Sequence, residues 1–599
     1  GIPVIGGAFL FDDSYTGKPL VFCGTGGVLP ASIGGEDGWR NSITPGEKAV
    51  MVGGRIGKDG IHGATFSSLA LDEESPTSAV QIGDPITQKK MLDFLLEARD
   101  LRLFTAITDN GAGGLSSSLG EMAEKSGGVI INLDTCPLKY QGLAPWEILV
   151  SESQERMSVS VPEEHLEEFL CLARKRGVEA TAVGTFTDSG AVEIYYEEEL
   201  LGLLDLEFLH NGLPVMELEA EWKPVEERTP TAPSVNSEQK RSAPSFRPPE
   251  AFLHIEDSPS PQEILEAILS DPNVSSKEHL IRQYDHEVQG HSIVKPFTGV
   301  HSDAPTDGAV IKPLYGSFRG VTVTHGLCPR VGDIDTYHMA QSAVDEAYRA
   351  HIACGGDPKM VSALDNFCWP DPVESSYTPD GRYKLAQLVR AAKGLKDACL
   401  AYEIPLISGK DSMKNDARIG DVKVSIRPTL LISVMGIITD VRKAMSTDFK
   451  AAGDRIFIVG RTTPELGGSS YGQVTGQRFS SCPAVDTEQA KTIFNAMAAS
   501  IEKEILSSCH DLSDGGLAVA AAESCIGGGV GAELKLDTMP GEQLHQYPVH
   551  VPLFAETPSR FLVSVSPSNQ TAFEQIVKEW GIPASNIGVV TEKPILSAA

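Results

Sequence analysis

The sequence predicts a mixed α/β (α+β) fold in which one two-domain unit occurs twice in tandem. Two motifs support the duplication. Ile2-Pro3-Val4-Ile5-Gly6-Gly7 returns as Ile404-Pro405-Leu406-Ile407-Ser408-Gly409 at an offset of 402 residues, and Asp109-x-x-x-Gly113-Gly114-Leu115 returns as Asp511-x-x-x-Gly515-Gly516-Leu517 at the same offset. A third observation fixes the class, because strands alternate with stretches long enough for helices in both copies. The period is too long for a solenoid, so each copy should be a body with its own core.

The two copies do not start at the same point. Only Gly1 precedes Ile2, whereas a long stretch of the second copy precedes Ile404. We therefore expect the N-terminal part of the first copy to be missing from this chain. Residues 221–262 contain eight prolines among polar residues, which is typical of an extended linker. The resulting division is 1–43 for the end of the first-copy N-terminal domain, 44–220 for the first-copy C-terminal domain, 221–262 for the linker, 263–445 for the second-copy N-terminal domain and 446–599 for the second-copy C-terminal domain.

Local signals place the first elements in chain order. Residues 1–40 are interpreted as strands and loops that finish an interrupted domain. In that region Leu20–Val28 should be a strand related to Thr429–Ile437 of the second copy. Val50–Gly53 is an apolar run that ends in a glycine turn, as a buried strand would. Asp84 before Pro85 is typical of a helix start, with Asp as the N-cap and proline at the first helical position.

The later elements of the first copy follow the same alternation. Met157–Val161 alternates apolar and polar residues, which predicts a strand. Residues 163–176 begin with two glutamates and end with three basic residues before Gly177, so they predict a helix whose charges match its dipole. Residues 446–599 repeat the pattern of 44–215.

Composition excludes several classes of function. No run of about 18 apolar residues occurs, so neither a transmembrane helix nor a membrane partner is expected. The net charge of −31 argues against a nucleic-acid partner that depends on phosphate neutralisation. The ten cysteines are scattered without a CxxC pair, which favours reduced thiols in a cytoplasmic protein.

Asp109 is the sharpest candidate for chemistry. It stands just before Gly111, Gly113 and Gly114, which open an Ala/Ser/Leu-rich helix. Free backbone N–H groups at such a helix start suit an anion, and an adjacent carboxylate can hold the Mg²⁺ that accompanies a phosphate. The alternative is an aspartate that only caps the helix. Its recurrence as Asp511 favours a site inherited by both copies.

A dense polar cluster, Glu152-Ser153-Gln154-Glu155-Arg156, precedes the strand at Met157. Its side chains could grip a polar substrate, or Glu152 and Arg156 could form a structural ion pair. The second copy keeps Glu556 and Arg560 but replaces Ser153-Gln154 by Thr557-Pro558. The Glu/Arg pair is therefore the better structural candidate, and Ser153-Gln154 the better functional one.

These motifs resemble the phosphoribosylformylglycinamidine synthase family, within a superfamily that includes aminoimidazole ribonucleotide synthetase and selenophosphate synthetase. The resemblance implies a tandem duplication of an aminoimidazole ribonucleotide synthetase-like unit. It also implies the synthetase component that converts formylglycinamide ribonucleotide to formylglycinamidine ribonucleotide in purine biosynthesis. ATP and Mg²⁺ would be needed, and ammonia would come from a separate glutaminase subunit, with or without a small bridging subunit. The matching stretches, which cover nearly the whole chain, are 1–7, 57–66, 81–85, 109–115, 145–157, 284–288 and 408–412.

The resemblance also implies roles for individual residues. Asp109 would ligate Mg²⁺. Lys410 stands where relatives have a metal-binding Asn, and an ammonium cannot ligate a metal, so either that ligand is lost or Lys410 meets a phosphate directly. The residues implied to contact the ribonucleotide are Gln81, Glu152, Ser153, Gln154 and Ser412, and those implied at the ATP site are Asp365, Gly409 and Lys410.

Two further implications concern what surrounds this site. The family's catalytic histidines lie in a Glu-Ser-His-Asn-His-Pro segment that the sequence does not contain, so the catalytic residues are unknown and this chain alone should lack a complete active site. Glu346, Asp511 and Asp514 match a region where large family members hold an auxiliary nucleotide. Ala350 stands there in place of an expected Asn, which weakens that assignment.

Two other functions stay open. The chain could be a nucleotide-binding structural or regulatory fragment without turnover. It could also be another ATP-dependent synthetase of the superfamily, although Gln81 and Glu152-Ser153-Gln154 weigh against that reading.

Overall fold

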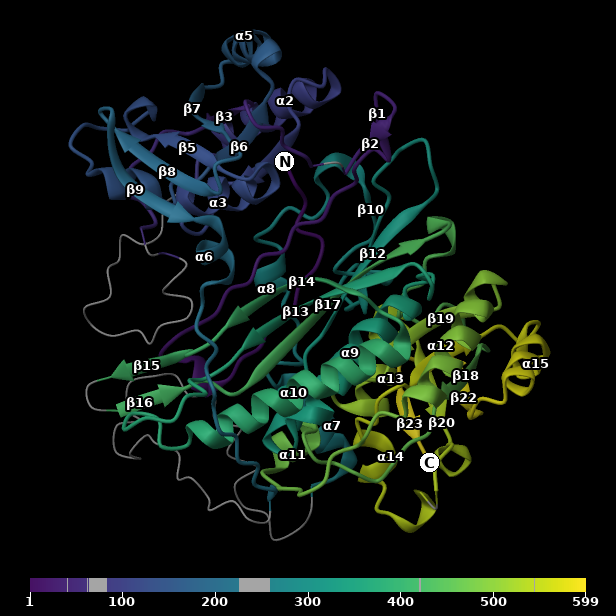
Figure 1. Ribbon diagram of the computed structural model, residues 1–599. Coiled ribbons are helices and arrows are strands. Elements are labelled where there is room, and N and C mark those ends of the chain that lie inside the picture. The colour runs from purple at the N-terminus through teal and green to yellow at the C-terminus, as the bar shows by residue number, and fades with distance from the viewer. Residues whose placement is uncertain (40, 62, 64–82, 226–258, 420–421, 543) are drawn as a thin grey trace. The chain divides into compact units, whose positions relative to one another are not determined.

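The computed structural model describes residues 1–599 apart from 40, 62, 64–82, 226–258, 420–421 and 543 (Figure 1). The chain divides into two compact units. The first unit is Val21–Glu217, and the second unit combines Gly1–Leu20 with Leu218–Ala599. Most of the predicted linker 221–262 lies outside the described residues, and the predicted domain boundaries stay predictions.

The first unit contains a seven-stranded sheet and a short hairpin of β1 (Ser32–Ile33) and β2 (Glu36–Asp37). Neighbouring strands of the sheet are antiparallel except β5 and β8, which are parallel. In sheet order the strands are β4 (Ala106–Asp109), β6 (Arg156–Val161), β3 (Lys48–Gly53), β7 (Ala180–Phe186), β5 (Val129–Asn132), β8 (Ala191–Tyr196) and β9 (Glu199–Asp205).

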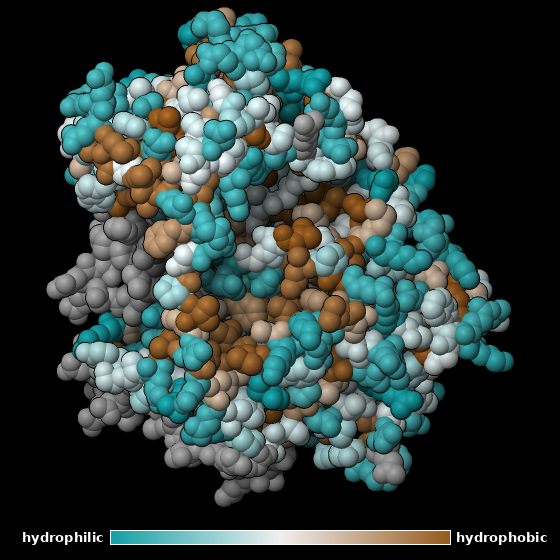
Figure 2. Space-filling model, in the orientation of Figure 1, coloured by the Kyte–Doolittle hydropathy of each residue, from teal (hydrophilic) through white to brown (hydrophobic). Residues whose placement is uncertain are grey.

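Helices cover both faces of this sheet. Met51 of β3 packs into one core with α3, whereas Val50 and Val52 pack into another core with α2 and α5, so β3 is buried on both sides, as its apolar run predicted. Figure 2 shows apolar side chains gathered over the part of this unit near β9, whose exposed leucines include Leu203. The helices are α2 (Pro85–Asp100), α3 (Gly114–Ser126), α4 (Pro145–Val150), α5 (Leu166–Arg176) and α6 (Leu206–Asn211).

The predicted start of α2 and the predicted end of α5 are confirmed, but α5 begins at Leu166, after a 3-10 turn over Glu163–His165. The Asp84 carboxylate accepts hydrogen bonds from the N–H groups of Ile86 and Thr87 and caps α2. Gly177 ends α5 with φ at 67°, a left-handed conformation that favours glycine.

The second unit contains two six-stranded sheets. Its first sheet is antiparallel except for the pair β13 and β14 at one edge. A separate hairpin joins β15 (Asp416–Ile419) and β16 (Val422–Ser425). In sheet order the strands of the first sheet are β10 (Ser292–Val294), β11 (Gly308–Ile311), β12 (Gly320–Gly326), β17 (Thr429–Ile438), β13 (Val361–Cys368) and β14 (Leu406–Ser412).

The second sheet repeats the sheet of the first unit. The strand order β19-β21-β18-β22-β20-β23 corresponds to β4-β6-β3-β7-β5-β8, including the parallel final pair. A register shift between Ala49 and Val50 recurs between Ile456 and Phe457. The duplication inferred from motifs is thereby confirmed. The strands are β19 (Leu506–Asp511), β21 (Phe561–Val565), β18 (Arg455–Val459), β22 (Ala584–Thr591), β20 (Gly531–Leu534) and β23 (Leu596–Ala598).

One hydrophobic core joins the two sheets of the second unit. It runs from Met339 on α9 to Ile582 after α15 and includes residues of β13, β17, β18 and β21. The helices of this unit are α7 (Pro261–Ser270), α8 (Glu278–Ile281), α9 (Thr336–Ala353), α10 (Gly381–Tyr402), α11 (Ser470–Thr475), α12 (Thr487–Glu502), α13 (Gly516–Gly528), α14 (His550–Phe554) and α15 (Gln570–Trp580).

One predicted strand is wrong. Thr429–Ile438 forms β17, but its proposed counterpart Leu20–Val28 is not a strand. β17 is held on both edges by β12 and β13, whereas Leu20–Val28 has no strand paired with it among the described residues. Residues 1–20 instead lie on the second unit, where Val4 N–H donates to Asp285 O and Phe11 N–H to Asn273. Among the described residues, no helix is both long and apolar enough to cross a membrane.

Candidate functional site

Asp109 ends β4 directly before the glycine turn that starts α3. Its side chain is exposed, and its Oδ1 accepts one hydrogen bond, 2.9 Å long, from the N–H of Gly111. It does not cap α3, because Gly113 is the N-cap and no side chain caps the helix, so the capping interpretation is wrong. Its Oδ2 accepts no hydrogen bond from a described residue. An exposed carboxylate with a spare oxygen fits a Mg²⁺ ligand.

The glycines of this turn are required by close packing. Gly114 has φ at 56°, and a Cβ there would lie 2.0 Å from Ser151 O. The counterpart Gly516 has φ at 61°, and its Cβ would lie 2.5 Å from Ala555 O. The start of each helix therefore packs closely against the loop that carries the Glu and Arg repeated in both copies.

Glu152 and Arg156 do not form the ion pair that was considered. The Glu152 Oε1 accepts from Gly113 N–H at 3.2 Å, at the start of α3. The buried Arg156 guanidinium donates to Ser153 O at 2.7 Å and Ser151 O at 2.5 Å, and burial lowers its pKa to about 10. Arg560 makes the equivalent bonds to Thr557 O and Ala555 O. Arg156 and Arg560 therefore anchor equivalent loops through backbone carbonyls, whereas Glu152 contacts the start of α3.

Ser153 is buried, whereas Gln154 is exposed. The Ser153 hydroxyl donates to Asp59 Oδ2 at 2.9 Å while accepting from Gly57 N–H at 3.0 Å. Burial opposes ionisation of Asp59, but hydrogen bonds from Lys139 and Ser153 lower its pKa. Gln154 is exposed and donates to Glu152 O at 2.9 Å. Gln154 is thus the member of this pair that a ligand can reach.

A polar pocket of about 340 Å³ opens beside Gln154 in the first unit. Gly53 and Gly54, at the end of β3, form part of its wall, and the lining contains three cationic and three acidic side chains. Such a lining suits a polar ligand. The lining residues are Gly53, Gly54, Arg55, Asp84, Thr87, Lys90, Lys139, Gln154, Glu155, Gly177, Val178 and Glu179. The predicted substrate contact Gln81 lies outside the described residues.

The residues predicted at the ATP site lie on two paired strands of the second unit. Asp365 on β13 pairs with Gly409 on β14, and a Cβ on Gly409 would lie 2.7 Å from Asp365 Oδ1. Burial raises the pKa of Asp365, as does the nearby carboxylate of Asp411. Lys410 is exposed, and its ammonium donates to Asp411 O at 3.1 Å.

Ser412, predicted to contact the ribonucleotide, is less accessible. It is buried at the end of β14, and its carbonyl accepts from Trp369 N–H at 2.9 Å and from Asn415 Nδ2 at 2.7 Å. The structure therefore places Asp365, Gly409, Lys410 and Ser412 along one strand pair.

The structure also brings Glu346, Asp511 and Asp514 together in the second unit. Glu346, on α9, accepts from Leu327 N–H at 2.8 Å, and burial together with Asp511 and Asp514 raises its pKa to about 7. Asp511 ends β19 and is paired with Arg349 at 3.2 Å, while Asp514 is paired with Arg330 at 2.8 Å.

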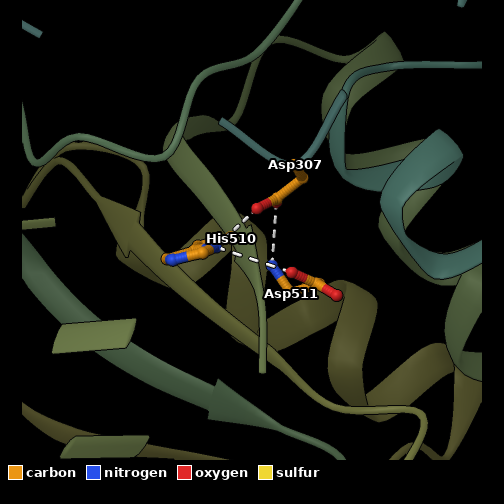
Figure 3. A group of neighbouring side chains, drawn as sticks. All are labelled: Asp307, His510 and Asp511. Atoms are coloured by element: carbon orange, nitrogen blue, oxygen red, sulfur yellow. Dashed lines mark hydrogen bonds and ion pairs between the residues drawn. The ribbon is translucent and has the colours of Figure 1, made fainter. Parts of the chain in front are cut away.

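Figure 3 shows Asp307, His510 and Asp511, a group among the described residues that could hold a metal ion. Their possible ligand atoms lie within 4.8 Å of one another. His510 Nδ1 lies 2.7 Å from Asp307 Oδ1, and His510 Nε2 lies 3.1 Å from Glu523 Oε2. Burial opposes protonation of His510, but these carboxylates raise its pKa well above its usual value. An imidazolium between two carboxylates has no lone pair for a metal.

Sequence reasoning missed several members of these clusters. Asp59 and Asp307 lie far from their partners in the chain, so only the fold brings them together. Arg349 carried one available signal, because its spacing from Asp345 places both residues on one side of α9.

Comparison with known families identifies both halves of the repeat. The model described as AIR synthase related protein, C-terminal domain, matches residues 44–197 and again 451–599. The model described as AIR synthase related protein, N-terminal domain, matches residues 306–438. The repeated match agrees with the two equivalent sheets.

Curated relatives extend the similarity along the whole chain. Phosphoribosylformylglycinamidine synthase subunit PurL of Alkaliphilus metalliredigens is 32% identical over 606 residues, which cover 98% of this chain and 74% of the relative. The subunit of the same name from a Thermoanaerobacter species is 34% identical over 605 residues, covering 99% of this chain and 75% of the relative. These comparisons do not support the expectation that an N-terminal portion of this protein is missing.

Solved structures support the fold. T. maritima PurL complexed with FGAR is 22% identical, with a TM-score of 0.61 and coverage of 92% of this chain and 72% of that chain. T. maritima PurL complexed with ATP is also 22% identical, with a TM-score of 0.57 and coverage of 92% and 71%.

Proposed function

This chain belongs to the family of phosphoribosylformylglycinamidine synthase subunits PurL, and on that premise we propose that it converts formylglycinamide ribonucleotide to formylglycinamidine ribonucleotide with ATP and ammonia. Members of this family are ATP-dependent ligases of purine biosynthesis. The observation that carries the proposal for this chain is local. Asp109 and Glu152 converge on one glycine turn at the start of α3, in the same unit as the polar pocket that Gln154 lines.

The reaction has two steps whose atoms balance. The amide oxygen of the substrate attacks the γ-phosphorus of ATP, and ADP leaves. Ammonia then attacks the activated carbon, and the carbon–oxygen bond breaks to release phosphate. Activation is needed because an amide oxygen is a poor leaving group, so catalysis rests mainly on positioning and on stabilising phosphate charge. Bound Mg²⁺ would supply part of that charge stabilisation.

We assign the first-unit residues by their accessibility. Asp109 holds Mg²⁺ through its exposed carboxylate, and Gln154 and Glu152 contact the ribonucleotide, with Gln81 as a further contact. Ser153 supports Gln154 and does not contact the ribonucleotide itself, because its hydroxyl is already hydrogen-bonded to Asp59 and Gly57.

In the second unit, Asp365 and Gly409 meet ATP. Lys410 meets a phosphate, since its exposed ammonium suits an anion and cannot replace a metal-binding Asn. Ser412 is buried and contributes through the backbone of β14.

The ammonia source is a separate glutaminase subunit, with or without a small bridging subunit. A solved assembly named PurLQS from Thermotoga maritima gives this arrangement a precedent in a relative. All ten cysteines are free, which agrees with a reaction in the cytoplasm.

Phosphate release tests the proposal. The protein is incubated with formylglycinamide ribonucleotide, ATP, Mg²⁺ and saturating ammonium, and Asp109→Asn is the matched control. We expect release that requires all four components and falls in the control. Binding of ATP without release would favour a structural or regulatory module. Release with another acceptor but not with this ribonucleotide would favour a different synthetase of the superfamily.

A further inference from the structure

We infer that the second copy's counterpart of the Asp109 site takes neither Mg²⁺ nor a nucleotide, because the chain's own charges fill each position that such a ligand would occupy. The site is then a structural ion cluster that fastens the two sheets of the second unit together. This inference concerns the second copy alone and stands apart from the proposed function. Four observations support it.

The anion position at the start of α13 is filled by Glu556. Its Oε1 accepts from Gly515 N–H at 2.6 Å and from Ser470 N–H at 2.8 Å, so these two backbone donors are not free for a phosphate. In the first copy the equivalent Glu152 accepts from Gly113 N–H at 3.2 Å and is half-buried.

The cation position beside Asp511 is filled by Arg349. Its guanidinium is buried and pairs with both Asp511, at 3.2 Å, and Asp345. Asp109, the counterpart of Asp511, has no arginine bound to it among the described residues and is exposed. A divalent ion at Asp511 would lie close to the positive charge of this buried guanidinium, which opposes its binding.

His510, the third possible metal ligand of this cluster, is also engaged by side chains of the protein. Both of its ring nitrogens face carboxylates, Asp307 on one side and Glu523 on the other, as Figure 3 shows for the first of these. Asp307 is also committed, because its Oδ2 accepts from Asp511 N–H at 2.9 Å. In the first copy the position of His510 is occupied by Thr108, which cannot form this pair.

The same cluster joins elements of both sheets. Asp345, on α9, accepts from the N–H of Ser559 at 2.8 Å and from the Tyr402 hydroxyl at 2.8 Å. Arg349 reaches from α9 to the end of β19. Buried ion pairs and hydrogen bonds that connect several elements in this way rigidify their packing.

Equilibrium dialysis of the whole protein with Mn²⁺ and the non-hydrolysable analogue AMPPCP tests the inference. Two variants probe the second copy: Asp511→Asn, and Glu346→Gln, which removes a candidate ligand while keeping its acceptor for Leu327 N–H. Asp109→Asn is the matched control in the first copy. Thermal melting shows whether each variant is folded. If Asp511→Asn does not fold, the binding measured for Glu346→Gln tests the inference.

We expect the wild type and both second-copy variants to bind the same single equivalent of Mn²⁺–nucleotide, and the control to bind none. Two equivalents in the wild type, or the loss of one equivalent in either second-copy variant, would overturn the inference. No binding by the wild type would agree with the inference and count against the first-copy metal site of the proposed function.

Discussion

Replacing Asp109 by Asn should separate chemistry from folding. Asp109 is exposed and makes one hydrogen bond, to Gly111 N–H, which the Asn side-chain oxygen can still accept. An exposed substitution of this kind changes the free energy of unfolding by about 0.5 kcal/mol at most. For a unit of this size, that corresponds to a change in melting temperature of about 2 °C or less.

The effect on metal-dependent chemistry should be far larger. Removing one charged ligand costs about 3 kcal/mol of transition-state stabilisation, which is roughly 100-fold in kcat/KM. The assay is phosphate release with ATP, formylglycinamide ribonucleotide and saturating ammonium, with Mg²⁺ varied at constant ATP. The variant should also need more Mg²⁺ to reach half of its maximal rate.

Asp109→Glu is the matched variant, because it keeps the charge and displaces it by one methylene. We expect it to retain more activity than Asp109→Asn at high Mg²⁺. A variant Asp109→Asn with near-normal turnover and a melting temperature lowered by many degrees would refute the reasoning, because it would make Asp109 a structural residue.

Three further changes probe other parts of the molecule. Arg156→Met should lower the free energy of unfolding by about 3 kcal/mol or more in urea titrations, since two buried carbonyls lose their donor; a loss below about 1 kcal/mol would contradict this. Gly409→Ala should weaken binding of AMPPCP by calorimetry while leaving the melting temperature nearly unchanged, because its Cβ would meet Asp365 Oδ1 at 2.7 Å; unchanged affinity would argue against this edge as the ATP site. Burial lowers the pKa of His325 and of His351 from 6.5 to about 4, so only the unfolded chain gains these protons between those values and stability should fall as pH drops through that window. The loss is about 3 kcal/mol for each histidine, and a urea midpoint that is flat between pH 7 and 4.5 would contradict it.

The repeat and the local helix signals could be predicted from the sequence because they depend on few residues. Asp84, Pro85 and Gly177 act through their own backbone geometry, and the structure places them as predicted. Asp109 was recognised from the glycines around it. The sequence could not show that Asp109 does not cap α3, because a shift of one or two residues in the start of the helix changes which residue is the N-cap.

The roles that failed depend on contacts between distant segments. Arg156 was paired with Glu152 because the two are four residues apart, but the chain turns sharply at Glu155, whose φ is 56°, and directs the guanidinium to backbone carbonyls instead. Leu20–Val28 was matched to Thr429–Ile437 through the repeat, yet a strand exists only where another strand offers it hydrogen bonds. Neither outcome is written in local sequence.

The core shared by the two sheets of the second unit means that a boundary of duplication is not a boundary of autonomous folding. Expressed alone, residues 446–599 would leave Phe494 without Tyr348 of α9, against which it packs, would expose part of the shared core, and would be prone to aggregate. The inherited module and the module that can stand by itself are therefore different stretches of this chain.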